Sequence, residues 1–298
     1  MTIAWVFPGQ GSQKKGMSDA VISLPEAKER FAMASEVLGR DLLKICEGKQ
    51  LEGIEISDIN DTRNTQPGLF VVESLIVDML KQKGQSPSLI AGHSLGEIVA
   101  LYAANVFDIQ TGLSLIKRRS ELMSSAGGGA MTAVLGFDRA ELEDLVNSNS
   151  EVVIANDNSI SQVVLSGTPS AVSKVSSQLK CKKAIPLQVS GAFHSPFMEA
   201  ASKAFALELD QVSFNNASIP ILSNSEPSLT TDGVILKERL KNQMTHGVRW
   251  REIMNVMDAE KITTVFEIGP GNVLSGLIKR SLKGLLVKQI YSESDFPN

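Results

Sequence analysis

Cysteine and histidine are scarce in this sequence. Among its 298 residues are two cysteines, Cys46 and Cys181, which lie far apart and outside any CxxC motif. A chain of this size needs no disulfide staples, so we expect both to be reduced thiols of a cytoplasm-like compartment, with a role in packing. The three histidines and two separated cysteines form no group of metal ligands, and the sequence therefore implies no metal site.

Blocks of like charge and long apolar runs are also missing. Twenty-nine basic and 33 acidic residues are dispersed along the chain, which leaves no electrostatic footprint for nucleic acid and no polybasic patch for a membrane. No uncharged stretch is long enough to span a bilayer, and residues 3–7 enter a strand-like run without the features of a signal peptide. We expect a soluble, untargeted, cytoplasmic protein that binds neither nucleic acid nor membranes.

The remaining composition is that of a globular protein with a large core. Hydrophobic residues make up 43% of the chain, and its length favours one large domain with a second, smaller one. A buried strand over Ile3–Phe7 ends at a glycine-rich loop, residues 8–13. Helical periodicity over 67–83 and 108–125, with a strand-turn-helix unit over 88–104, indicates an α/β domain with a parallel sheet.

The order of elements changes after the triple glycine at 127–129. The patterns that follow predict two βαβ-like halves in the order strand, helix, strand, strand, helix, strand, at 130–136, 139–147, 151–156, 162–167, 169–179 and 183–189. This βαββαβ order is the ferredoxin-like unit. We predict a large hydrolase-like α/β domain, residues 1–126 and 190–298, with an inserted ferredoxin-like α+β domain, residues 127–189. Residues 291–298 are polar and are expected to form a loose tail.

A GxSxG pentapeptide, Gly92 to Gly96, stands between the predicted strand and helix of the 88–104 unit. Small residues on both sides let the backbone bend sharply and hold the Ser94 hydroxyl at a helix N-terminus, where free N–H groups face developing negative charge. Glycines beside a serine also occur at ordinary strand-to-helix turns. In this setting, we interpret Ser94 as a nucleophile.

A serine nucleophile needs a neighbouring base, which is usually imidazole. The side chain of His93 should point away from Ser94 on a sharp turn, so a structural hydrogen-bonding role is expected. His246 follows a predicted helix, where capping is expected. His194 lies where the insertion returns to the large domain and directly before a helix with Ser195 as its cap and Pro196 at its first position. A cleft between domains favours His194 as the base, and the alternative is that it belongs only to the helix cap.

Six motifs in order make the chain resemble malonyl-CoA:acyl carrier protein transacylases, the acyltransferase family of fatty acid and polyketide synthesis. The motifs span nearly the whole chain and are Phe7 to Gln13, Gly92 to Glu97, Arg119 to Met123, Asn156 to Ser159, Gly191 to Ser195 and Glu267 to Gly271. The resemblance implies transfer of a malonyl group from malonyl-CoA to the phosphopantetheine thiol of acyl carrier protein. It also implies a malonyl-serine ester on Ser94 and general-base chemistry at His194, a ping-pong reaction of a Ser-His dyad.

The resemblance also assigns the residues around the dyad. The backbone N–H groups of Gln10 and Leu95 would form the oxyanion hole. A backbone carbonyl at Arg249 would orient the imidazole. Arg119 would pair with the malonyl carboxylate through two parallel hydrogen bonds, which a lysine does not reproduce and an acetyl group does not need. From local sequence alone, Arg119 also fits a solvated residue of the cluster 117–119.

Three further residues are expected to bind substrate. Met123 sets the spacing that selects Arg119 over Arg118, and Asn156 matches a position near the water network of the site. Phe193, beside the base, resembles the bulky residue of malonyl-selective members, where it would crowd an α-methyl branch, and so favours malonyl over methylmalonyl groups. The chain departs from the common pattern after Ser159, where proline and glycine are usual, at Ser120, where glycine is frequent, and at Arg249, which replaces a glutamine.

The implied partners are malonyl-CoA, as substrate, and acyl carrier protein, and no cofactor is implied. Because carrier proteins are acidic, a local basic rim is expected; the candidates are Lys182, Lys183, Lys279, Arg280 and Lys283. A free-standing chain favours fatty acid synthesis.

Two other functions fit parts of the same sequence pattern. Serine hydrolases of the lipase or esterase type share GxSxG, but their histidine usually lies near the C-terminus and the inserted unit is foreign to their plan. A catalytically silent module that only docks carrier protein would tolerate loss of Ser94, His194 or Arg119, and all three are present.

Overall fold

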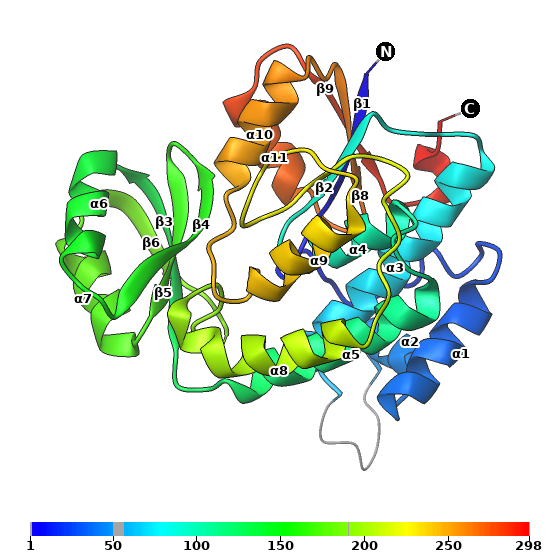
Figure 1. Ribbon diagram of the computed structural model, residues 1–298, viewed down its shortest axis with the longest axis horizontal. Coiled ribbons are helices and arrows are strands. Elements are labelled where there is room, and N and C mark those ends of the chain that lie inside the picture. The colour runs from blue at the N-terminus through cyan, green and yellow to red at the C-terminus, as the bar shows by residue number, and fades with distance from the viewer. Residues whose placement is uncertain (1, 50–56, 190, 298) are drawn as a thin grey trace.

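Two β-sheets of different kinds organise the fold (Figure 1). The computed structural model describes residues 2–49, 57–189 and 191–297. The first sheet has the order β7-β2-β1-β8-β9, and all its neighbouring strands are parallel. Its strands are β1 (Ile3–Phe7), β2 (Leu89–Gly92), β7 (Ile221–Leu222), β8 (Thr264–Ile268) and β9 (Leu286–Ile290).

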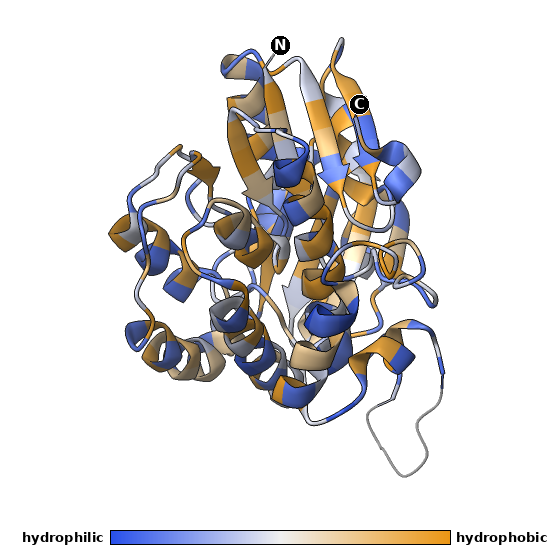
Figure 2. Cartoon of the chain, turned by 90° about the vertical axis from the view of Figure 1, so that its right-hand side faces the viewer, coloured by the Kyte–Doolittle hydropathy of each residue, from blue (hydrophilic) through white to orange (hydrophobic). Residues whose placement is uncertain are grey.

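Both faces of this parallel sheet are buried, because each face is covered by helices. Ala4 and Val6 of β1 point into a core formed with α10 (Trp250–Ala259) and α11 (Val273–Ser281). Trp5 and Phe7 alternate with them and face the larger core. The elements around that larger core are α1 (Ala27–Leu38), α2 (Leu42–Cys46), α3 (Thr62–Gln82), α4 (Gly96–Ala103), α5 (Ile109–Ser125), the 3₁₀ turn η1 (Pro196–Met198), α8 (Glu199–Asp210) and α9 (Gly233–Asn242). The strands of this sheet are mostly orange in Figure 2, as expected for strands with two covered faces.

The second sheet lies between the large domain and two helices at the far edge of the molecule (Figure 1). It is antiparallel with the order β4-β5-β3-β6. Its elements are β3 (Ala130–Phe137), α6 (Arg139–Asn147), β4 (Val152–Ser159), β5 (Gln162–Gly167), α7 (Pro169–Gln178) and β6 (Cys181–Pro186). Val134 and Leu165 face α6 and α7, whereas Met131 and Val164 join the core of the large domain. The sheet therefore gives one face to its own helices and the other to the large domain.

The predicted fold class is confirmed: a parallel α/β domain carries an antiparallel α+β unit of βαββαβ order. The exact domain limits, 126/127 and 189/190, stay a prediction. Ser190, where the return to the large domain was placed, and the terminal residues Met1 and Asn298 lie outside the described residues.

The C-terminal segment differs from the expectation of a loose tail. After β9, which was not predicted, the chain forms a 3₁₀ turn, η2 (Glu293–Asp295), in which Ser292 and Asp295 form a capping box. The Tyr291 hydroxyl donates to the Met17 carbonyl, and the Phe296 side chain is buried. The polar composition of the segment concealed two aromatic residues: Tyr291 contacts Lys14 and Met17 of the N-terminal region, and Phe296 joins the large core.

None of the helices in the described part of the chain combines the length and apolar character that crossing a membrane requires.

Candidate active site

Ser94 occupies a sharp turn between β2 and α4, and two glycines make that turn possible. Its φ is 55°, in the left-handed region that non-glycine residues seldom adopt. A Cβ added to Gly96 would lie 2.2 Å from the Phe7 carbonyl oxygen, and one on Gly92 would lie 1.9 Å from the backbone of Gly96. The backbone at the turn is therefore packed too closely for any side chain at these two positions. This close packing holds the serine at the carboxyl end of the sheet, where ligands of open α/β sheets bind.

His194 meets Ser94 from the segment that follows the small domain. The Nε2 atom of His194 lies 2.7 Å from Ser94 Oγ, and the ring is buried. Its Nδ1 lies 3.0 Å from the Gln243 carbonyl oxygen. Because a carbonyl oxygen only accepts, Nδ1 carries the proton, and the bare Nε2 accepts the hydrogen bond from the Ser94 hydroxyl. The structure thus places the predicted nucleophile next to a correctly oriented base.

Burial and the nearby positive charge of Arg119 lower the pKa of His194 to about 3. The imidazole is therefore neutral in the free protein at neutral pH. A neutral imidazole is the form that can accept the serine proton.

The carbonyl that orients His194 is not the one expected. The sequence interpretation placed it at Arg249, but the Arg249 carbonyl accepts from the N–H groups of Glu252 and Ile253 in the first turn of α10. The carbonyl of Gln243 is available instead, because Gln243 is the C-cap residue of α9, and the last carbonyls of a helix have no partner within it. The prediction for Arg249 was wrong for this physical reason.

Arg119 lies in the same site and is fully buried, with an exposed fraction of 0%. Its Nη2 donates to Ser94 Oγ at 3.1 Å and to Gln243 Oε1 at 2.8 Å, and its Nη1 donates to Gln66 Oε1 at 2.8 Å. In the described part of the chain no carboxylate forms an ion pair with it, and its Nε has no partner. Burial lowers its pKa to about 10, so the guanidinium stays charged at neutral pH. The site therefore holds a buried cation with spare donors beside the serine.

The backbone N–H groups of Gln10 and Leu95 donate no hydrogen bond within the described ranges. Leu95 is the N-cap residue of α4, so its N–H is one of the free donors of that helix. Gln10 lies in the loop after β1, where Ser12 folds back onto the Gly9 carbonyl through both its N–H and its hydroxyl. Both donors are thus free, and their binding of an oxyanion beside Ser94 stays a prediction from the resemblance.

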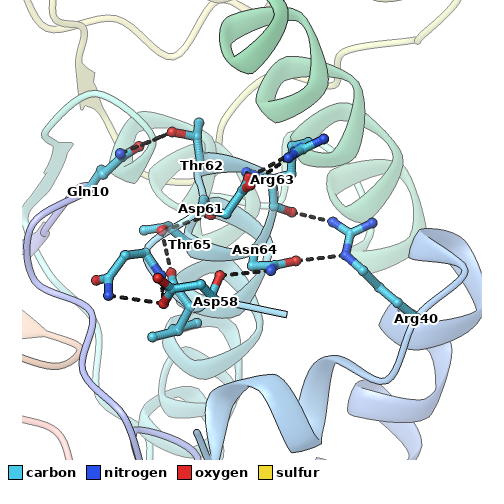
Figure 3. Close-up of polar contacts among 10 residues, drawn as sticks. Gln10, Arg40, Asp58, Asp61, Thr62, Arg63, Asn64 and Thr65 are labelled. Atoms are coloured by element: carbon cyan, nitrogen blue, oxygen red, sulfur yellow. Dashed lines mark hydrogen bonds and ion pairs between the residues drawn. The ribbon is translucent and has the colours of Figure 1, made fainter. Parts of the chain in front are cut away.

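The side chain of Gln10 is fixed at the start of α3, as Figure 3 shows. It bonds with the Thr62 hydroxyl, and Asp61 caps the helix by accepting from the Arg63 N–H. Arg40 and Asn64 extend this network, with 2.7 Å between Arg40 Nε and Asn64 Oδ1. The network anchors the loop that carries the Gln10 N–H against a long, buried helix.

A pocket opens above the dyad. Its lining residues come from both domains: Gln10, Gln66, His93, Ser94, Leu95, Met123, Met131, Asn156, Leu187, Val189, Phe193 and His194. Three of the residues expected to bind substrate, Met123, Asn156 and Phe193, are among them. The Oδ1 atom of Asn156 is buried and has no partner among the described residues, so it is an acceptor available to a molecule in the pocket.

The other histidines take the structural positions expected of them. His93 Nε2 lies 2.9 Å from Asn158 Oδ1, and burial lowers the pKa of its ring. His246 Nδ1 lies 2.9 Å from the Asn242 carbonyl at the end of α9.

Three buried polar residues of the site were not foreseen: Gln66, Asn224 and Gln243. The Asn224 side chain accepts from the Ser94 N–H at 2.7 Å and donates to the Gly92 carbonyl at 2.5 Å, which ties both ends of the turn together. Gln243 donates to the Ser94 carbonyl at 2.9 Å and to Glu97 Oε2 at 2.7 Å. Of these three residues, Gln66 lies next to a predicted element, since it directly precedes Pro67 at the start of the helical periodicity over 67–83.

Comparisons with known proteins place this geometry in context. Residues 4–293 match the family described as "Acyl transferase domain". The chain is 48% identical over 290 residues to the malonyl CoA-acyl carrier protein transacylase of Synechocystis sp., covering 97% of both chains. The crystal structure of the Synechocystis transacylase superposes with a TM-score of 0.94 and covers 99% of both chains. A complex of a type II polyketide acyl-carrier protein with its malonyl-transacylase has a TM-score of 0.91 at 32% identity, with 99% of this chain and 97% of that chain covered.

Proposed function

This chain belongs to the acyl transferase family, and we propose that it transfers the malonyl group of malonyl-CoA to the phosphopantetheine thiol of acyl carrier protein. The observation that carries this function is the buried Arg119 beside the Ser94–His194 pair. A buried cation without a carboxylate partner is costly, and a substrate that brings its own carboxylate into the pocket supplies that partner. A malonyl group has such a carboxylate.

In the first half-reaction, His194 Nε2 takes the hydroxyl proton of Ser94 as Oγ attacks the thioester carbonyl carbon. The carbonyl oxygen becomes an oxyanion that accepts from the N–H groups of Gln10 and Leu95. Each such donor contributes roughly 2.7–4 kcal/mol to the transition state in comparable acyl transfers. The tetrahedral intermediate then expels the CoA thiolate, which receives the proton from His194 Nε2. The products are free CoA and a malonyl ester on Ser94.

The second half-reaction runs the same steps in reverse order with a new thiol. His194 takes the proton of the phosphopantetheine thiol, and the thiolate attacks the ester carbonyl of malonyl-Ser94. The intermediate expels Ser94 Oγ, which recovers its proton from His194 Nε2. The enzyme returns to its starting state with malonyl on the carrier protein.

Selection of the acyl group follows from the pocket walls. Arg119 would hold the malonyl carboxylate through charge-assisted hydrogen bonds, whereas an acetyl group leaves the guanidinium unpaired. Phe193 is buried beside His194, and its ring already packs so closely that a Cβ on Gly191 would lie 2.5 Å from it. Phe193 also lines the pocket, and we expect this bulky, closely held ring to crowd an α-methyl branch, which favours malonyl over methylmalonyl.

We place the reaction in the cytoplasm and in fatty acid synthesis, and we expect it to need no cofactor. The chemistry described here uses only side chains and backbone donors of the chain, with malonyl-CoA as a substrate.

Intact-protein mass spectrometry after mixing with malonyl-CoA tests the proposal. We expect one malonyl adduct on the wild-type protein and none on Ser94→Ala. The isolated adduct should pass to holo acyl carrier protein faster than to water. Faster loss to water would instead indicate a serine hydrolase, and the absence of any adduct on the wild type would indicate a docking module.

A further inference from the structure

Arg119 is not isolated from negative charge in the free protein, although no described carboxylate touches it. Glu97, in the first turn of α4, is buried with an exposed fraction of 1%. Burial raises the pKa of its carboxyl, while hydrogen bonds from Gln243 and Asn224 favour the charged form. Between the two lies the side-chain amide of Gln243, which accepts from Arg119 Nη2 at 2.8 Å and donates to Glu97 Oε2 at 2.7 Å.

The orientation of this amide is fixed by its neighbours. A guanidinium can only donate, and the Ser94 carbonyl and the Glu97 carboxylate oxygen can only accept. The oxygen of Gln243 must therefore face Arg119, and its nitrogen must face Glu97. The amide dipole thus points its negative end at the cation and its positive end at the anion, which makes Arg119, Gln243 and Glu97 a bridged ion pair.

Glu97 is also held in place from the other side. The Asn224 N–H donates to Glu97 Oε2 at 3.1 Å, and the Asn224 side chain binds the backbone of the Ser94 turn. The carboxylate is consequently fixed beneath the site. It cannot swing away when a second anion reaches Arg119.

Resting on the proposed function, we propose that Glu97 is a specificity-determining residue that acts through Gln243 and competes with the malonyl carboxylate for the charge of Arg119. In the free enzyme the bridged pair compensates a cation that would otherwise be buried alone. When malonyl binds, one guanidinium serves two carboxylates, so Glu97 weakens malonyl binding and leaves the binding of uncharged acyl groups unchanged. Because this cost is the same in the ground state and the transition state, it raises the KM for malonyl-CoA and leaves kcat unchanged.

Glu97→Gln removes this charge and preserves the shape of the side chain. Its amide oxygen can take the position of Oε2 and still accept from Gln243 and Asn224. In a Ser94→Ala background, which stops the chemistry, we expect Glu97→Gln to lower the Kd of malonyl-CoA about five- to tenfold, the size of a unit charge several ångströms away in a partly polar site. The Kd of acetyl-CoA should stay the same. With Ser94 present, the KM for malonyl-CoA should fall without a rise in kcat.

Glu73→Gln is the matched control. Glu73 is fully buried in α3, its oxygens have no partner in the described chain, and burial beside Glu267 raises the pKa of its carboxyl well above the usual value. Glu73 is not among the described residues that line the pocket or hydrogen-bond to Arg119, so its amide variant should leave both Kd values unchanged.

Glu97→Gln leaves Arg119 without a compensating carboxylate, and the variant could therefore fold poorly. A second variant keeps the test decisive in that case. Gln66 Oε1 accepts from Arg119 Nη1 at 2.8 Å, so Gln66→Glu places a carboxylate on the opposite side of the cation. The double variant Gln66→Glu with Glu97→Gln restores the charge balance, and its malonyl-CoA Kd should exceed that of Glu97→Gln.

The outcomes separate this inference from the proposed function. Unchanged or weaker malonyl-CoA binding in Glu97→Gln, or equal changes for malonyl-CoA and acetyl-CoA, would overturn the role of Glu97 while the transferase remained. If the Ser94→Ala protein did not prefer malonyl-CoA over acetyl-CoA at all, the proposed function would fail, and the role of Glu97 with it.

Discussion

The parallel sheet of the large domain and the antiparallel sheet of the small domain contribute to the same pocket in different ways. The large domain places its reacting groups by backbone packing, as at Gly92 and Gly96, where an added Cβ would meet other backbone atoms at 1.9 and 2.2 Å. The small domain supplies wall residues such as Met131 and Asn156 through side chains of a sheet packed between its own helices and the large domain. Backbone contacts thus position the reacting serine, whereas side-chain packing positions the wall that encloses the substrate.

The two regions meet at β4. The Asp157 N–H donates to the Val248 carbonyl at 2.9 Å, and the Val248 N–H donates to the Ala155 carbonyl at 2.8 Å. The Asp157 carboxylate binds Arg139 of the small domain and Arg251 of α10, with N–O distances of 2.9 and 2.8 Å. The wall is therefore tied to the large domain by one strand and one shared carboxylate.

Removing the buried cation of the large domain, Arg119, should have the largest effect on activity. Arg119→Ala removes the partner of the malonyl carboxylate and should lower kcat/KM for malonyl-CoA at least a hundredfold relative to acetyl-CoA, since such pairs contribute roughly 3–5 kcal/mol. Asn156→Ala, a change in the wall, should affect both substrates alike. Steady-state kinetics with the two thioesters decides the question, and equal losses in Arg119→Ala would contradict the assignment.

The backbone packing of the turn should be the next most sensitive feature. Gly96→Ala drives a methyl group into the Phe7 carbonyl and should lower the free energy of unfolding by roughly 3 kcal/mol or more, because the backbone cannot move aside without opening the sheet. Gly127→Ala is the control: nothing lies within 4 Å of its added Cβ. Urea denaturation compares the two variants. Similar stabilities would show that the turn is less constrained than the structure indicates.

Removing the Asp157 carboxylate should have a smaller effect on the free energy of unfolding, and this effect should depend on pH. Burial alone would raise the pKa of Asp157, but hydrogen bonds from Arg139 and Arg251 hold it below its usual value. A lowered folded-state pKa means that the contribution to stability is present above the unfolded pKa of about 3.9 and is lost as the pH falls through the folded one. Asp157→Asn should therefore cost about 2 kcal/mol at pH 7, and the difference from wild type should shrink below about pH 4.

Denaturation at several pH values checks this. Glu143→Gln, which breaks the exposed ion pair between Glu143 and Arg139, should cost less than about 0.5 kcal/mol at any pH. A penalty for Asp157→Asn that did not vary with pH would mean that its charge is unimportant.

Sequence patterns predicted best where local physics sets the limits of an element. The helix Arg139–Asn147 and the strand Gln162–Gly167 have the predicted bounds. Asp138 caps the helix by accepting from the Glu141 N–H, and a continuous run of buried residues marks the strand. In contrast, α1 follows Glu26, which has a φ of 61° and no side-chain cap, so the sequence lacks the capping residue that marks the start of many helices.

The C-terminal strand β9 was missed for a different reason. Three of its five residues, Leu286, Lys288 and Gln289, are exposed because the strand lies at the edge of the parallel sheet. An edge strand has no continuous apolar run to reveal it. The partial burial of Tyr291 and the burial of Phe296 depend on contacts with residues far away in the sequence, which a local pattern cannot contain.

The difference between local sequence signals and long-range contacts also applies to the site. Ser94 and His194 belong to local motifs, and the structure brings them within 2.7 Å. Gln243 acts through a backbone carbonyl and an amide that matter only once α9 packs against the turn. A backbone carbonyl leaves no trace in residue identity, which is why the orienting group was assigned to Arg249.

The smallest effect should appear at the groove between the two domains. Lys279 and Arg280, both exposed at the end of α11, line it together with Gln162 of β5. Because carrier proteins are acidic, reversing both charges with Lys279→Glu and Arg280→Glu should raise the KM for carrier protein about three- to tenfold at low salt and less at high salt, where screening is strong. The KM for malonyl-CoA should not change. Lys174→Glu, at another exposed residue on the outer helix α7, is the control. An equal effect there, or none at the groove, would remove Lys279 and Arg280 from the docking surface.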